Sequence, residues 1–306
     1  MPYDDSPPPT RRARPRSVAA ALTAVCLTAA GCGSGQGADG SGAAPPRPGA
    51  DAASSAAPTP TGKQPQPSGT ASPADSAKPL PKGPLTGRTV VIDPGHNPGN
   101  RDHTREINEK VDIGTGRKEC DTTGTSTDDG YAEARFTLDV SHRLRTLLEA
   151  EGARVRLTHD ADRPFGPCID ERARIGNEAE ADAVVSVHAD GSAVGNRGFH
   201  VILPAAVKGG GADTSKIVKS SADLGASIAG HFVRTTGSAP SNYIGGNTGL
   251  DTRNDLGGLN LSTAPKVFVE CGNMRDPQDA ALLTSASWRQ KAARGLADGI
   301  TGYLKG

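Results

Sequence analysis

Four residues of the sequence have the chemistry of a hydrolytic metal site: His96, Glu133, His188 and Glu270. Two imidazoles and one carboxylate form the ligand set of many catalytic zinc sites, which keep a fourth position open for water. Bound zinc lowers the pKa of that water and polarises a carbonyl group, and a further carboxylate can carry the water proton to the leaving amine. The pattern predicts a zinc hydrolase with His96, Glu133 and His188 as ligands and Glu270 as the catalytic carboxylate.

Each of these residues also has an ordinary structural interpretation. A His after Pro-Gly can be a turn residue, and a His at a strand end can simply bond to the backbone. Glu133 at the start of a helix suits the helix macrodipole. Glu270 is the hardest to explain structurally, because a carboxylate at the end of a buried strand needs a partner or a function.

Predicted strands deliver three of the four residues to one edge. Apolar, β-branched runs predict buried parallel strands at residues 89–93, 182–188 and 266–270, each ending at or near a candidate residue. Two more strands are predicted at 154–158 and 198–203. Helices are predicted at 131–151, 168–181, 215–235 and 287–304, and a long polar loop at 97–130. Strands alternating with helices indicate an α/β fold with helices on both faces, and sites in such sheets gather beyond the carboxyl ends of the strands.

Composition divides the 306 residues into a part that can fold and a part that cannot. The first 84 residues are crowded with Ala, Pro, Gly and Ser and bury too little apolar surface to offset the entropy of ordering. Residues 85–306 are long enough for one domain with a substantial core. The net charge is zero, aromatic residues are few and no basic stripe follows the N-terminus, so a nucleic-acid partner is not expected.

The N-terminus has the pattern of an export signal. Arg11 to Arg16 form a basic segment, and residues 18–30 are small and apolar but too short to span a bilayer. Ala29-Ala30-Gly31-Cys32 resembles a bacterial lipobox, in which Cys32 would be lipidated. Residues 1–31 are therefore predicted to be a lipoprotein-type signal peptide and 32–84 a disordered tether. Cleavage near Ala29-Ala30 without lipidation is the alternative.

Four segments resemble the zinc-dependent N-acetylmuramoyl-L-alanine amidases of the amidase-3 type. They are Val91-Ile92-Asp93-Pro94-Gly95-His96, Gly130-Tyr131-Ala132-Glu133, Ser186-Val187-His188-Ala189-Asp190 and Val269-Glu270-Cys271-Gly272-Asn273-Met274. The resemblance covers residues 85–306 and is strongest to mycobacterial periplasmic members. Asn97-Pro98 replaces the usual Gly-Gly after the first His, and Cys271 replaces a common hydrophobic residue, which could alter substrate fit.

The resemblance implies a single domain with a twisted, mostly parallel sheet of about six strands. It implies hydrolysis of the amide between the lactyl group of N-acetylmuramic acid and L-alanine in peptidoglycan or muropeptides, with zinc held by His96, Glu133 and His188. The enzyme would act outside the cytoplasm as a monomer, with the lipid on Cys32 as its only membrane contact. Arg172 and Arg253 are candidate substrate contacts, although charges on a helix surface or a loop are the ordinary alternative.

The cysteines fit an extracytoplasmic protein. Cys120 and Cys168 form a candidate disulfide outside the membrane, where disulfides persist, with two reduced thiols as the alternative. Cys271 is expected to be a small buried residue, although a thiol beside the metal could be a rival ligand.

Two other functions compete with the amidase. A carbohydrate deacetylase would need an Asp with a paired His-x₃-His, which the sequence lacks. A lipoprotein that binds peptidoglycan without cleaving it would not need all four site residues.

Overall fold

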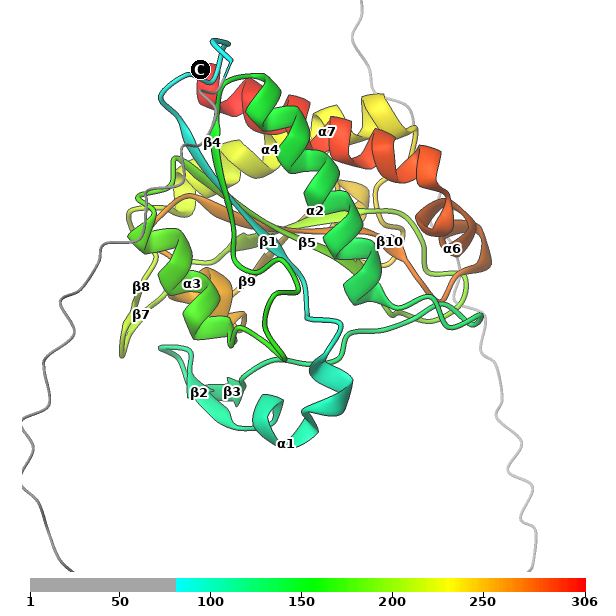
Figure 1. The fold of residues 1–306 in the computed structure, drawn as a ribbon, viewed down its shortest axis with the longest axis horizontal. Helices are drawn as coiled ribbons and strands as arrows, with labels where there is room; N and C mark the ends of the chain where they lie inside the picture. Colours follow the sequence, from blue (N-terminus) through cyan, green and yellow to red (C-terminus); the bar gives the residue numbers. More distant parts are fainter. Residues whose placement is uncertain (1–80) are drawn as a thin grey trace, which may run out of the picture. The chain divides into compact units, whose positions relative to one another are not determined.

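The computed structural model describes residues 81–306, which form a six-stranded sheet covered by helices (Figure 1). The strand order is β4-β1-β5-β10-β6-β9. Strands β4, β1, β5 and β10 are parallel, β6 runs antiparallel to β10, and β9 is parallel to β6. The predicted mostly parallel α/β sheet is thus confirmed. The strands are β1 (Thr89–Pro94), β4 (Arg154–Leu157), β5 (Ala183–Asp190), β6 (His200–Pro204), β9 (Leu250–Arg253) and β10 (Lys266–Asn273).

One face of the sheet carries the main hydrophobic core. Three long helices cover it: α2 (Glu133–Ala150), α4 (Val218–Thr236) and α7 (Ala286–Lys305). Their apolar side chains meet alternate residues of β1, β5 and β10, which include Ile92, Val187 and Val269 and are fully buried. Such alternation follows from the two-residue side-chain period of a strand. A short helix, α6 (Pro277–Thr284), is capped by the preceding residue Asp276, whose side chain accepts hydrogen bonds from the first-turn amides.

The opposite face is covered by shorter elements. Helices α3 (Ile169–Glu178) and α5 (Gly257–Asn260) pack there, beside a hairpin of β2 (Lys110–Asp112) and β3 (Arg117–Glu119). The hairpin follows η1 (Asn100–Asp102) and α1 (Thr104–Ile107), and Figure 1 shows this segment away from α4 and α7. Helices therefore lie on both faces, as expected.

The structure differs from the sequence prediction mainly in short elements. The predicted loop at 97–130 contains η1, α1 and the β2–β3 hairpin. The sequence prediction also omitted α5, α6, β9, a hairpin of β7 (Lys208–Gly209) and β8 (Ala212–Asp213), and η2 (Gly245–Asn247). Except for α6, these elements have two to four residues and show no periodic pattern, because they are held by contacts with the rest of the fold. The eight residues of α6 include only two that are buried, Asp279 and Leu283, so this helix lacks an apolar stripe.

The disulfide expected between Cys120 and Cys168 is present. It joins the end of the β2–β3 hairpin to the residue before α3, and the backbone N–H of Ile169 donates to the carbonyl of Cys120 at 2.8 Å. Cys271 has a free thiol and is buried. The predicted signal peptide, Cys32 and nearly all of the tether lie outside the described residues. The described residues include no helix long and apolar enough to cross a membrane.

Candidate metal centre

The structure brings His96, Glu133 and His188 together at the carboxyl edge of the sheet. Their ligating atoms lie within 4.8 Å of one another. Oε1 of Glu133 is 3.1 Å from Nε2 of His96 and 3.0 Å from Nδ1 of His188. Two neutral imidazole nitrogens and one carboxylate oxygen are the donors that zinc binds in hydrolytic sites. The donor set therefore fits a zinc ion.

Each of the three side chains comes from a different element. His188 lies two residues before the end of β5, whereas His96 follows β1 by two residues, in a turn where its φ is 62°. Glu133 is the first residue of α2, where the helix macrodipole favours a negative charge. Its Oε1 accepts from the backbone N–H of Ala189 at 3.2 Å and its Oε2 from that of Thr125 at 2.9 Å. These bonds fix the carboxylate between the two imidazoles.

Two glycines leave room for this crowding. A Cβ atom on Gly95 would lie 2.4 Å from Cε1 of His188. A Cβ atom on Gly124 would lie 2.7 Å from both Oε2 of Glu133 and Cδ2 of His96, and its φ of +72° also favours glycine. The site can form only because no side chain occupies these two positions.

Mutual interactions shift the pKa values of the ligand pair in opposite directions. Burial alone would raise the pKa of Glu133, but the charge of His96 and hydrogen bonds from His188 and His96 lower it overall. Burial would lower the pKa of His96, whereas Glu133 and Asp121 raise it to about 10. The surroundings of these side chains thus favour positive charge beside the Glu133 carboxylate, as a cation site requires.

Glu270 lies beside the three ligands on the central strand β10. It pairs in register with His188 on one side and with His200 on the other. Its Oε2 atom is buried and has no hydrogen-bond partner among residues 81–306. Burial, together with the charges of Glu133 and Asp190, raises the pKa of Glu270. A buried carboxylate oxygen without a donor is costly, which is typical of a group kept for chemistry rather than for stability.

A cavity of about 240 Å³ opens beside His96 and His188. Phe268 stacks on the His188 ring with centroids 5.1 Å apart and forms part of the cavity wall. Leu256 and Ile169 add apolar surface, and Lys118 of the hairpin lies at the cavity too. This cavity can hold part of a substrate next to the candidate metal.

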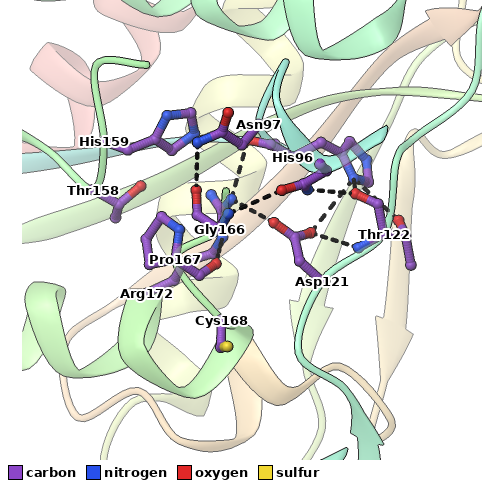
Figure 2. A network of polar contacts seen from close by, with 12 residues as sticks. His96, Asn97, Asp121, Thr122, Thr158, His159, Gly166, Pro167, Cys168 and Arg172 are labelled. Carbon is purple, nitrogen blue, oxygen red and sulfur yellow. Dashed lines mark hydrogen bonds and ion pairs between the residues drawn. The ribbon is translucent and has the colours of Figure 1, made fainter. Parts of the chain in front are cut away.

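Arg172 is not the helix-surface charge of its ordinary interpretation, and it lies in the wall of the cavity beside His96. It is 4% exposed and forms ion pairs with Asp93 at 2.9 Å and Asp121 at 2.8 Å. Figure 2 shows Arg172 beneath the turn that carries His96. The placement is a correction: α3 faces the sheet at this residue, and carboxylates from distant segments neutralise the guanidinium.

Arg253 ends β9 and forms an ion pair with Asp255 at 2.8 Å, with 38% of its side chain exposed. It matches the alternative of a local surface charge. The thiol of Cys271 is directed at the carbonyl of Val269, and Cys271 does not belong to the cluster of candidate ligands. Its interpretation as a small buried residue is the one that the structure favours.

Sequence reasoning overlooked several polar residues near the site. Lys266 is fully buried and pairs with Asp93 at 3.1 Å, while Ser186 donates to Asp93 at 2.9 Å. Tyr243 donates to Asp190 at 2.7 Å. The sequence did contain a signal for the first pair: Lys266 and Asp93 each lie in an apolar strand segment. Charged residues are rarely buried unless they are paired, so a partner could have been expected for each.

Comparisons with known proteins agree on one family. The profile of the Amidase_3 family, described as N-acetylmuramoyl-L-alanine amidase, matches residues 90–302. The chain is 39% identical over 240 residues to N-acetylmuramoyl-L-alanine amidase Rv3717 of Mycobacterium tuberculosis, covering 76% of this chain and 93% of that protein. The crystal structure of the amidase Ami1 from Mycobacterium smegmatis matches with 40% identity and a TM-score of 0.66, covering 72% of this chain and 98% of the other. Ami1 from Mycobacterium abscessus matches with 41% identity and a TM-score of 0.65, covering 72% of this chain and 100% of the other.

Proposed function

Because this chain belongs to the N-acetylmuramoyl-L-alanine amidase family, we propose that its catalytic metal is zinc, held by His96, Glu133 and His188. The enzyme is a peptidoglycan amidase that hydrolyses the bond between N-acetylmuramic acid and L-alanine. The observation that supports the ligand set is the convergence of its three donor atoms within 4.8 Å. When bound, zinc supplies Lewis acidity to the scissile carbonyl and a more acidic water.

Glu270 is proposed as the catalytic residue that moves protons. Its Oε2 has no donor from the described chain, so it is free to take a proton from the attacking water. Its position next to His188 in the sheet register supports this role. The same carboxyl group then gives the proton to the amine of L-alanine as the amide bond breaks. Glu133, held by two backbone amides, keeps its place during this transfer.

The division of roles is tested by comparing Glu270→Ala with His96→Ala. We expect Glu270→Ala to bind zinc normally and to lose about 10²–10⁴-fold in kcat, the usual contribution of general acid–base catalysis. His96→Ala should lower the zinc stoichiometry. Mass spectrometry of muropeptides after incubation measures release of stem peptide with a free L-alanine amine, and elemental analysis measures zinc. Full activity of Glu270→Ala would contradict its role, and unchanged zinc in His96→Ala would remove that residue from the ligand set.

We also infer action outside the cytoplasm, anchored by a lipid on Cys32. The basic and apolar N-terminal segment and the lipobox-like residues before Cys32 support this inference. Cys32→Ser should move the protein from the membrane fraction to the soluble fraction of its bacterial host, with the catalytic domain unaffected. Membrane association that survives this substitution would contradict the anchor. A monomer remains the expectation, which sedimentation can check.

A further inference from the structure

Both ring nitrogens of His96 have polar neighbours. Nε2 lies 3.1 Å from Glu133, at the candidate metal centre. Nδ1 lies 3.0 Å from the carbonyl oxygen of Thr122, 3.1 Å from its hydroxyl and 3.6 Å from Oδ1 of Asp121. Because a carbonyl oxygen can only accept, these neighbours favour a proton on Nδ1 and leave the lone pair of Nε2 for a metal.

Hydrogen bonds from neighbouring groups restrain the carboxylate of Asp121. It is 6% exposed, its Oδ1 accepts from the backbone N–H of Thr122 at 2.8 Å, and its Oδ2 accepts from Nη2 of Arg172 at 2.8 Å. The carboxylate therefore has one oxygen toward the His96 turn and the other toward Arg172, as Figure 2 shows. It has little freedom to move away from His96.

Arg172 ties together the segments that meet at this turn. Its Nη1 donates to Oδ1 of Asp93 at 2.9 Å and to the carbonyl of Pro94 at 2.6 Å. Its Nη2 donates to the carbonyl of His96 at 3.0 Å, besides Asp121, and its Nε donates to the carbonyl of Pro167 at 2.8 Å. A guanidinium has five N–H donors, and these five acceptors use all of them, so none is left for a substrate.

The turn needs such restraint because His96 has a φ of 62°. This left-handed conformation is uncommon for residues other than glycine and persists when the surroundings enforce it. The disulfide between Cys120 and Cys168 adds a covalent link between the residue before Asp121 and the start of the helix that carries Arg172. The two positioning groups are thereby held to each other as well as to the turn.

We propose that Asp121 and Arg172 are positioning residues for the metal ligand His96. Asp121, with the Thr122 carbonyl, orients the imidazole so that Nε2 faces the metal, and Arg172 locks both Asp121 and the strained turn. Both residues line the cavity beside His96, and the role proposed for them acts through His96. The proposal rests on the proposed role of His96 as a ligand, so the experiment must separate the two.

The experiment measures the zinc affinity of the full chain. Each variant is stripped of metal and then titrated with Zn²⁺ in competition with a chromophoric chelator. We expect Asp121→Asn and Arg172→Lys to bind Zn²⁺ about 10–100-fold more weakly, the usual cost of losing a partner behind a ligand. Lysine keeps the charge but cannot make the five directed bonds of the guanidinium. Asp102→Asn changes an exposed residue of η1, and Arg174→Gln changes an exposed residue of the same helix as Arg172; both variants should match the wild type.

A variant could also lose zinc affinity because the whole fold is less stable. A second measurement and a second control variant distinguish this explanation from the positioning role. In ¹⁵N NMR of the zinc-loaded protein, His96 of the wild type should carry its proton on Nδ1, and Asp121→Asn should show a mixture of tautomers. Ile300→Ala removes buried apolar volume on the opposite face and should lower the melting temperature without changing the tautomer or the Zn²⁺ affinity of folded protein.

The following outcomes decide the question. Binding within twofold of the wild type in Asp121→Asn, or an unchanged tautomer, overturns the positioning role. Weakening in Ile300→Ala equal to that in Asp121→Asn also overturns it, because the effect would then follow stability alone. His96→Ala separates the two hypotheses. If this variant keeps stoichiometric zinc, His96 is not a ligand. If it loses zinc while Asp121→Asn binds zinc normally, His96 remains a ligand and only the positioning role is contradicted.

Discussion

The two faces of the central sheet are built from the same strands, but one face packs against the apolar core and the other carries charged and candidate site residues. On one face, alternate residues such as Ile92, Val187 and Val269 enter an apolar core under the three long helices. On the other face, the residues next to them in sequence include Asp93 and His188. Because successive side chains of a strand point to opposite faces, one short segment can supply both. Most of the stability can thus come from one face, which leaves the other free to hold charged groups.

The polar face holds its charges in balance. Asp93 and Asp121 are paired with Arg172 and Lys266, and all four side chains are buried. A buried pair adds little stability compared with apolar packing, but removal of one partner leaves a charge without compensation. We therefore expect the two faces to respond differently to substitution.

The largest effect is expected for Asp93→Ala. Its removal deprives both Arg172 and Lys266 of an ion-pair partner inside the protein. The free energy of unfolding should fall by about 3–5 kcal/mol, measured by urea denaturation of the metal-free chain. On the apolar face, Ile300→Ala should cost about 2–5 kcal/mol through the cavity that it leaves. A cost below about 1 kcal/mol for Asp93→Ala would contradict the expectation that removing one buried charge leaves its partners uncompensated.

A smaller but more specific effect is expected from a pair of Gly→Ala substitutions. In Gly95→Ala the new methyl group would overlap the His188 ring, since the Cβ position lies 2.4 Å from it. A displaced ligand should lower kcat/KM about 100-fold, which follows from the sensitivity of catalysis to misplacement by about 1 Å. Muropeptide hydrolysis provides the measurement.

Gly225→Ala is the matched control on the apolar face, in α4. There the Cβ position lies 2.4 Å from Cδ2 of Leu203, the end of a flexible side chain. Overpacking should cost about 1–3 kcal/mol of stability, partly offset by the better helix propensity of alanine, worth about 1 kcal/mol. Activity should stay within about twofold, since strain on this face does not reach the ligands. A large loss of activity in this variant would mean that the faces are mechanically coupled.

Much of the fold could be predicted because its main signals are local. The strands around Val91, Val185 and Val267 are runs of β-branched residues, and the long helices have a clear apolar period. His188 and Glu270 could be singled out in the same way, as polar groups near the ends of such runs. The short elements α5, β2 and β3 could not, because four or fewer residues hold no period.

Local patterns in the sequence were enough to predict most of the strands, the long helices and the chemistry available near the strand ends. Which charged residues pair with one another depends on the folded chain. Arg172 and Arg174 are two residues apart on one helix and look equivalent in the sequence, yet one is buried and the other exposed. The carboxylates that neutralise Arg172 come from 79 and 51 residues away. Local sequence cannot specify partners at that separation, because only chain folding brings opposite charges into a region where water no longer screens them.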